Sequence, residues 1–143
     1  MNIKIVNLSD NPLPTYAHDG DAGFDLMSDE TVVLNSGEIR AIGTGLYMEI
    51  PKGYEGQVRS RSGLSLKDIV VNNAPGTIDS NFQGEIKVIL KNGGFGSFKV
   101  EKGMRIAQMV ISRHDVASFK VVESIDEFNS SERGEKGFGS TGL

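Results

Sequence analysis

Hydrophobic and polar residues alternate over short stretches through most of the sequence. The clearest stretch has Ile86, Val88 and Leu90 on one face of an extended chain, and Lys87 on the other. A period of two residues is typical of a half-buried β-strand, and the glycine-rich stretch 92–96 that follows predicts a hairpin. No segment keeps apolar residues at helical spacing for three turns, so we expect short strands and turns to dominate.

Segments rich in β-branched and aromatic residues recur at intervals of about ten residues, each closed by Gly, Pro or Asn. Strands are predicted at Val32–Leu34, Glu38–Ile42, Thr44–Ile50, Glu55–Ser60, Gly84–Leu90, Ser97–Val100, Arg105–Ser112 and Ser118–Glu123. This regular spacing is typical of a β-sandwich or jelly roll. The best helical candidate, 63–68, is barely more than one turn long, with Ser62 as its predicted N-cap.

The composition is that of one water-soluble domain: 143 residues, of which 38% are hydrophobic and 24% charged. No apolar stretch approaches the roughly 18 residues of a membrane span, so no membrane partner is expected. The net charge of −4 argues against a nucleic-acid partner. The absence of cysteine, and a start without the pattern of an export signal, favour the cytoplasm.

The composition changes at Asn129, where Gly, Ser and charged residues take over and Phe138 is the single aromatic side chain. A segment of this kind cannot bury enough apolar surface to order itself. We therefore divide the chain into a folded domain, 1–128, and a flexible C-terminal arm, 129–143. A frayed tail is the simplest interpretation of the arm, and a mobile lid is the alternative.

Five short segments carry a resemblance to a known family. They are AGFDL at 22–26, RSGL at 61–64, NAPGTIDSNFQGEI at 73–86, RIAQM at 105–109 and RGEKGFGSTG at 133–142. In this order they resemble the trimeric deoxyuridine triphosphate nucleotidohydrolases, the dUTPases. The third segment is highly specific, and together the five span nearly the whole chain.

The resemblance implies an all-β protein, a distorted jelly-roll β-sandwich or barrel with one short helix, that assembles as a homotrimer. Its active sites would lie at subunit interfaces, each completed by a C-terminal arm. It also implies Mg²⁺-dependent hydrolysis of dUTP to dUMP and pyrophosphate, which limits uracil in DNA and supplies dUMP for dTTP synthesis.

The third segment is suited to recognising a base. Thr77 and Ile78, followed by 82–84, predict the two arms of a tight hairpin after the turn residues Asn73 and Gly76. Uracil differs from cytosine in its N3 donor and O4 acceptor, so fixed backbone groups and the Asn73 amide can distinguish them, as the resemblance implies. The alternative for Asn73 is a turn residue that satisfies its own backbone.

Asp79 is the predicted catalytic residue. By resemblance it orients and deprotonates the water that attacks the α-phosphorus in line. From the sequence alone, an Asx-turn cap explains it equally well. Phe82 stands where the family usually has a tyrosine that packs against the deoxyribose, so the aromatic face is kept and the hydroxyl is lost; the alternative is an ordinary core residue.

The second segment has the chemistry of a phosphate site. Arg61 brings charge, Ser62 a hydroxyl and Gly63 close approach, with the positive end of the short helix behind them. A structural ion pair is the alternative for Arg61, which the family pairs with the acidic residue of the first segment. That residue, Asp25, is expected to contact Mg²⁺ only in the outer sphere, through water; a surface strand end is its alternative.

Two further substrate contacts are implied by the resemblance. Gln108 interrupts an apolar run, and a buried amide needs a partner, either a substrate phosphate or a cross-strand group. Lys87 matches a position that some family members use for substrate, although a solvated strand face explains it as well.

The arm supplies the last predicted contacts. Phe138 can stack over uracil and Arg133 can meet the γ-phosphate. Backbone and hydroxyl donors come from Gly139, Ser140 and Thr141. The family usually has glycine where this chain has Lys136, so the path of the arm is expected to differ there.

The sequence is compatible with three other functions. A dCTP deaminase shares the fold family, although the third segment and the complete arm favour dUTP hydrolysis. A catalytically silent, nucleotide-gated binding protein could use the same trimer to hold a protein partner. A carbohydrate-binding jelly roll is remote, because the chain has no Trp and only three Tyr to form a sugar platform.

Overall fold

The computed structural model describes residues 1–142. The strands are β1 (Lys4–Asn7), β2 (Gly23–Met27), β3 (Val32–Leu34), β4 (Ile39–Gly43), β5 (Leu46–Glu49), β6 (Tyr54–Arg59), β7 (Ile69–Val71), β8 (Gly76–Ile78), β9 (Lys87–Asn92), β10 (Phe98–Val100) and β11 (Arg105–Arg113). One α-helix, α1 (Ser62–Ser65), and one 3₁₀ turn, η1 (Ile125–Glu127), complete them. Strands form nearly all of the regular structure, as the alternation predicts.

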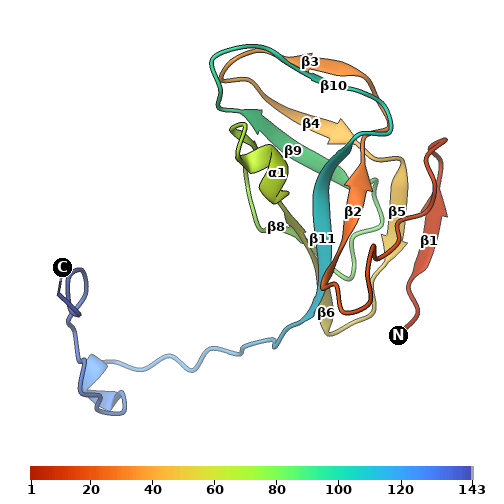
Figure 1. Ribbon diagram of the computed structural model, residues 1–143. Coiled ribbons are helices and arrows are strands. Elements are labelled where there is room, and N and C mark those ends of the chain that lie inside the picture. The colour runs from red at the N-terminus through yellow and green to blue at the C-terminus, as the bar shows by residue number, and fades with distance from the viewer. Residues whose placement is uncertain (143) are drawn as a thin grey trace.

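The strands form a jelly-roll β-sandwich (Figure 1). One sheet has the order β2-β11-β6-β8 and another the order β4-β9-β7, while β1–β5 and β10–β3 form two-stranded pieces. Every pair is antiparallel. The register places Met109 opposite both Phe24 and Val58, and all three side chains are buried. Alternate residues of each sheet therefore meet in one core.

The alternation that predicts β9 is confirmed by burial. Val88 and Leu90 are fully buried, as is Ile86 just before the strand, whereas Lys87 is exposed. Seven predicted strands are found, six of them with one or both ends shifted by one to three residues. Three strands, β1, β2 and β7, were not predicted, because each is short and β2 contains Gly23 and Asp25. Strand β8 matches the first predicted hairpin arm, Thr77 and Ile78.

The predicted hairpin after β9 is wrong, because β9 pairs with β4 and β7 whereas β10 pairs with β3. Asn92 explains the change of sheet. Its buried amide donates to the carbonyl oxygens of Leu34 (3.0 Å) and Gly96 (2.8 Å), and accepts from the Gly94 N–H at 3.0 Å. These bonds turn the chain towards β3.

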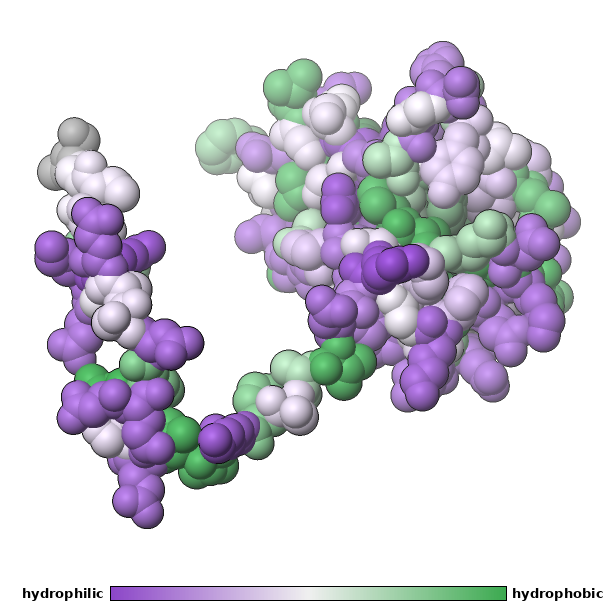
Figure 2. Space-filling model, turned by 90° about the horizontal axis from the view of Figure 1, so that it is seen from below, coloured by the Kyte–Doolittle hydropathy of each residue, from purple (hydrophilic) through white to green (hydrophobic). Residues whose placement is uncertain are grey.

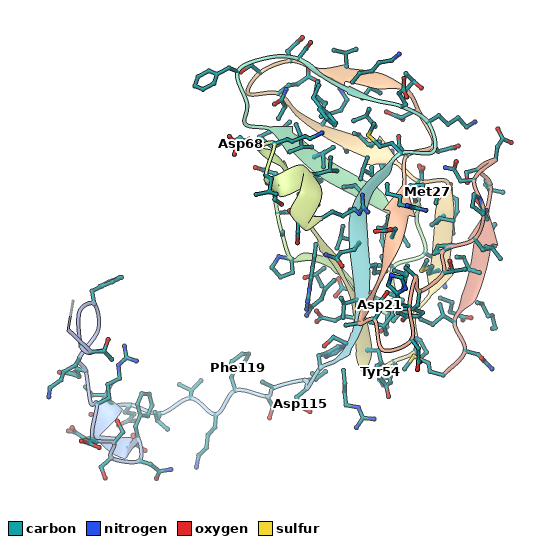
Figure 3. The ribbon with its side chains drawn as sticks, in the orientation of Figure 1. Asp21, Met27, Tyr54, Asp68, Asp115 and Phe119 are labelled. Carbon is teal, nitrogen blue, oxygen red and sulfur yellow. The ribbon has the colours of Figure 1, made fainter. Side chains whose placement is uncertain are left out.

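The prediction of a strand at 118–123 is also wrong, because these residues form no strand in the single chain. Residues 115–128, which we call the connector, run outward from the end of β11 and contain no strand (Figure 1). Figure 3 places Asp115 and Phe119 on this extended stretch, away from the body. The sequence has β propensity, but the described residues offer it no partner strand for a hydrogen-bonded ladder.

The helix begins one residue earlier than predicted, and Ser62 is not its N-cap. Arg61 occupies that position with extended backbone angles, and no side chain caps the first turn. The chain stays coiled up to Asp68, whose N–H donates to the Ser65 carbonyl at 3.0 Å and whose φ of 58° ends the turn. No helix in residues 1–142 has the length and apolar character to cross a membrane.

Candidate active site

Asp79 follows the edge strand β8. The chain turns directly after it, where the Phe82 N–H donates to the Asp79 carbonyl at 3.1 Å. The carboxylate is exposed in an open hollow of about 880 Å³, which we call the aspartate hollow, and accepts no hydrogen bond from residues 1–142. The Asx-turn alternative is therefore not what the structure has, and the group is free to meet a ligand.

The predicted second arm of the hairpin is not formed, since residues 82–84 join no strand. Strand β8 pairs only with β6, so one edge of its backbone keeps unpaired N–H and C=O groups. Asn73 lies beside this edge: a Cβ at Gly76 would come within 3.1 Å of the Asn73 Nδ2 atom. Glycine at this position lets the amide approach the strand, and the site offers both backbone and amide groups to a base.

Phe82 is not a core residue, because 40% of it is exposed. Its ring lies against Gly84, where a Cβ would come within 2.7 Å of the ring Cζ. The far end of the ring thus lies against a glycine, and the residue stays partly open to solvent.

A second hollow, of about 500 Å³, gathers the predicted phosphate residues and is called the phosphate hollow here. Its lining is Asp25, Arg61, Ser62, Gly63, Leu64, Lys67 and Gln108. The Arg61 Nε lies 2.8 Å from the Asp25 Oδ1, and an Arg61 Nη donates to the Arg105 carbonyl at 3.1 Å. The ion pair considered for Arg61 therefore exists, and it orients the guanidinium within the hollow.

Gln108 also has the cross-strand partner considered for it. Its Nε2 donates to the Ser60 carbonyl at 3.0 Å. Its Oε1 lies over Gly23, where a Cβ would be 2.9 Å away. The side chain is thus held by the residue that follows β6 and packs closely on Gly23 of β2, and it lines the phosphate hollow.

The prediction that the positive end of the short helix helps to bind phosphate is not supported. α1 has only four residues, so it is a single turn with few aligned peptide dipoles. Any phosphate in this hollow would depend on side chains and individual N–H groups.

Lys87 and the arm residues are not brought to either hollow in one chain. The Lys87 Nζ lies 3.8 Å from the Glu85 Oε2, on an exposed strand face. The arm stands apart from the body (Figure 1), with its five predicted contact residues exposed. These residues are Arg133, Phe138, Gly139, Ser140 and Thr141. Arg133 Nε donates to the Lys136 carbonyl at 2.8 Å, which closes a local turn.

The two hollows have no lining residue in common. One chain therefore offers a base-and-aspartate part, a phosphate part and an arm, without joining them. A complete site would therefore combine parts from different chains, as a site at a subunit interface does.

Residues that were not predicted also line the hollows. The aspartate hollow includes Lys4, Glu49, Lys52 and His114. The Lys4 Nζ lies 2.7 Å from the Glu49 Oε2, and this hydrogen-bonded carboxylate raises the pKa of the Lys4 ammonium. Lys67 in the phosphate hollow stands one helical turn after Gly63, and that spacing is the signal that could have found it.

The carboxylate of Asp25 fits a magnesium ion only in the outer sphere, through a water molecule. Residues 1–142 contain no group of three or more His, Cys, Asp or Glu placed to hold a metal. Asp25 faces two guanidinium groups, with Arg61 Nε at 2.8 Å and Arg105 Nε at 3.6 Å. A carboxylate compensated in this way is a poor direct ligand, although it can still accept a hydrogen bond from a water on the ion.

A jelly-roll sandwich with an exposed aspartate at a sheet edge, and a separate hollow lined by Arg61, Ser62 and Lys67, has groups that suit a water-activating carboxylate and a phosphate-containing ligand. The family model described as dUTPase matches residues 9–142. A deoxyuridine 5'-triphosphate nucleotidohydrolase from Clostridium acetobutylicum is 54% identical over 100% of this chain and 98% of its own length. One from Crocosphaera subtropica is 50% identical over the full length of both. This chain belongs to the dUTPase family.

Solved structures agree with this assignment. The dUTPase of Staphylococcus bacteriophage 80alpha with dUpNHpp has a TM-score of 0.90 and 35% identity, over 99% of both chains. A mutant dUTPase from phage phi11 of S. aureus, described with a structural Mg(II) ion, has a TM-score of 0.82 and 28% identity. It covers 89% of this chain and 100% of its own.

Proposed function

We propose that this chain hydrolyses dUTP to dUMP and pyrophosphate, and that it does so as a homotrimer with Mg²⁺. The observation that carries the proposal is the exposed, unbonded Asp79 carboxylate beside the open edge of β8. The names of its relatives and the dUTP analogue in the related phage structure support the same substrate.

Recognition of the base is assigned to the β8 edge. Unpaired backbone groups of Thr77 and Ile78, with the Asn73 amide, would pair with the N3 donor and O4 acceptor of uracil. Cytosine presents the opposite pattern and would leave these groups mismatched. Phe82 would pack against the deoxyribose and leave no room for a 2′-hydroxyl.

The chemical step is assigned to Asp79. Its carboxylate accepts a proton from a water whose oxygen forms a bond to the α-phosphorus. The bond from that phosphorus to the oxygen bridging towards the β-phosphate breaks in line, and pyrophosphate leaves with the electron pair. Asp79 has no competing hydrogen bond in residues 1–142, so its carboxylate is available to the water.

The polyphosphate is assigned to the phosphate hollow. Ser62 and Gly63 would contact phosphate oxygens beside Arg61, with Gln108 held nearby by Ser60. Bound Mg²⁺ supplies positive charge to the triphosphate, and Asp25 would accept a hydrogen bond from one of its waters.

The homotrimer brings these parts together. The aspartate hollow of one copy would face the phosphate hollow of a second, and an arm, 129–143, would cover the pair with Arg133 near the γ-phosphate and Phe138 over uracil. Lys87 remains a proposed contact of the same assembled site. The enzyme's implied role, which is to limit uracil in DNA and supply dUMP, requires access to the nucleotide pool. We therefore place the reaction in the cytoplasm.

The test is pyrophosphate release from dUTP, dCTP, TTP and UTP, with and without Mg²⁺. We expect activity on dUTP alone, preferred by about 10³-fold or more. Asp79→Asn should lower kcat by about 10²- to 10⁴-fold, since it removes the proton acceptor. Asp115→Asn, on the connector, is the matched control and should leave kcat unchanged. Ammonia release from dCTP would instead identify a deaminase, and tight dUTP binding without turnover would identify a silent binding protein.

A further inference from the structure

We propose that Lys67 supplies the positive charge that the substrate phosphates meet in the phosphate hollow, and that Arg61 acts chiefly as a positioned hydrogen-bond donor. This inference rests on the proposed function and assigns a substrate contact that the family motifs do not mark.

The charges of the hollow carry the argument. Arg61 and Asp25 are 2.8 Å apart and both line it, so the Asp25 carboxylate offsets much of the Arg61 charge at a ligand there, while the second guanidinium on Asp25, that of Arg105 at 3.6 Å, lies outside the lining. Lys67 is the remaining ionised side chain in the lining, and within residues 1–142 it has no ion-pair partner. A hollow meant for a polyanion needs uncompensated positive charge, and Lys67 is the residue that provides it.

The backbone around Lys67 is fixed, which favours a binding role over a loose surface lysine. Its N–H donates to the Leu64 carbonyl at 2.9 Å. The next residue, Asp68, accepts from the Gly93 N–H at 2.8 Å, so the turn after α1 is tied to the turn after β9. A fixed Cα limits the conformations that the side chain must lose when it binds a phosphate.

The same arrangement gives Arg61 a different task. Its guanidinium is held by Asp25 and by the Arg105 carbonyl, so its orientation is set before substrate arrives. Removing Arg61 would also leave the Asp25 carboxylate less compensated and facing the phosphates, so loss of activity on its removal does not by itself measure its charge contribution.

The experiment compares Lys67→Gln, Lys67→Arg and wild type in dUTP hydrolysis, with inhibition by inorganic pyrophosphate as a second readout. For Lys67→Gln we expect kcat/KM to fall about five- to tenfold and the pyrophosphate Ki to rise by a similar factor, because a hydrogen bond to a charged group is lost. The slope of log KM against log salt should become shallower. Lys67→Arg, which keeps the charge, should stay within about threefold of wild type.

Lys99→Gln is the control, because it removes the same charge from β10, outside both hollows. Thermal unfolding of each variant checks that folding is unchanged. The inference is overturned if Lys67→Gln leaves both kcat/KM and the pyrophosphate Ki within about twofold, or if Lys99→Gln has an equal effect. A wild-type protein inactive on dUTP would instead remove the proposed function, so the two failures are distinguishable.

Discussion

Glycine at position 23 is required by a side chain on another strand. The Gln108 Oε1 lies where a Cβ on residue 23 would come within 2.9 Å, and the Met109 carbonyl is 3.3 Å from the same point. The amide can move, whereas the carbonyl belongs to the β2–β11 ladder. The glycine of the first family segment thus makes room for the glutamine of the fourth.

Gly23→Ala should therefore displace the Gln108 amide from the phosphate hollow. We expect kcat/KM for dUTP to fall about five- to tenfold, with a stability loss near 1 kcal/mol from the broken bond to Ser60. Steady-state kinetics and urea unfolding measure the two effects. In a Gln108→Ala background the same alanine should cost almost no further activity, and an additive double mutant would contradict this explanation. Gly96→Ala, at an open position, is the control.

Arg61 and Asp25 show what residue patterns could and could not predict. The motifs located Asp79 and the lining of the phosphate hollow, because each segment carries its chemistry in adjacent residues. The ion pair of Arg61 with Asp25 was foreseen as an alternative, on the family resemblance, and the structure has it. The motifs could not predict that Lys67 joins the same lining, since it lies outside the second segment and its position depends on the fold. A cross-strand partner for Gln108 was one of two alternatives, but the sequence could not identify that partner as Ser60.

At the scale of elements, one buried amide decides how two sheets are connected. Asn92 ends β9, is 1% exposed, and bonds to Leu34, Gly94 and Gly96. Without these hydrogen bonds, nothing in the glycine-rich turn would direct the chain from β9 towards β3. A buried amide that loses all its partners costs far more than an exposed one.

Asn92→Ala should lower the free energy of unfolding by about 2–4 kcal/mol, because three hydrogen bonds are lost, one of them to the carbonyl of the buried Leu34. Urea unfolding at fixed protein concentration measures this, since assembly would make stability depend on concentration. Asn35→Ala, an exposed position, should change stability by less than about 0.5 kcal/mol. An equal loss in the two variants would remove the special role of Asn92.

Alternation predicts a strand but not its neighbour. It located β9 and the shared face of Ile86, Val88 and Leu90, because burial on one face is written into the order of residues. The alternation gave wrong predictions for the hairpin after β9 and for the strand at 118–123. A hydrogen-bonded ladder needs a second strand, and the local sequence does not specify which strand that is. The start of the short helix was located within one residue, whereas its end was placed three residues too late and its cap was assigned to Ser62 instead of Arg61.

At the scale of the whole molecule, the chain has the features of a subunit. The connector exposes apolar side chains that a free monomer would not leave in water, as Figure 2 shows along its length. They include Val116, Phe119 and Val121, each more than 85% exposed. With the site parts divided between two hollows and an arm, these surfaces support a site built from several copies.

Mixed trimers test this division of the site. Asp79→Asn damages the aspartate hollow and Arg61→Gln the phosphate hollow, so homotrimers of either variant should be nearly inactive. If each site takes Asp79 from one copy and Arg61 from another, refolding an equal mixture should restore both groups in about a quarter of the sites. Activity of the mixture should then rise well above the sum of the separate variants, with an unmixed pair as control. If both groups came from one copy, no mixture could contain an intact site, and activity that stayed at the sum would show this.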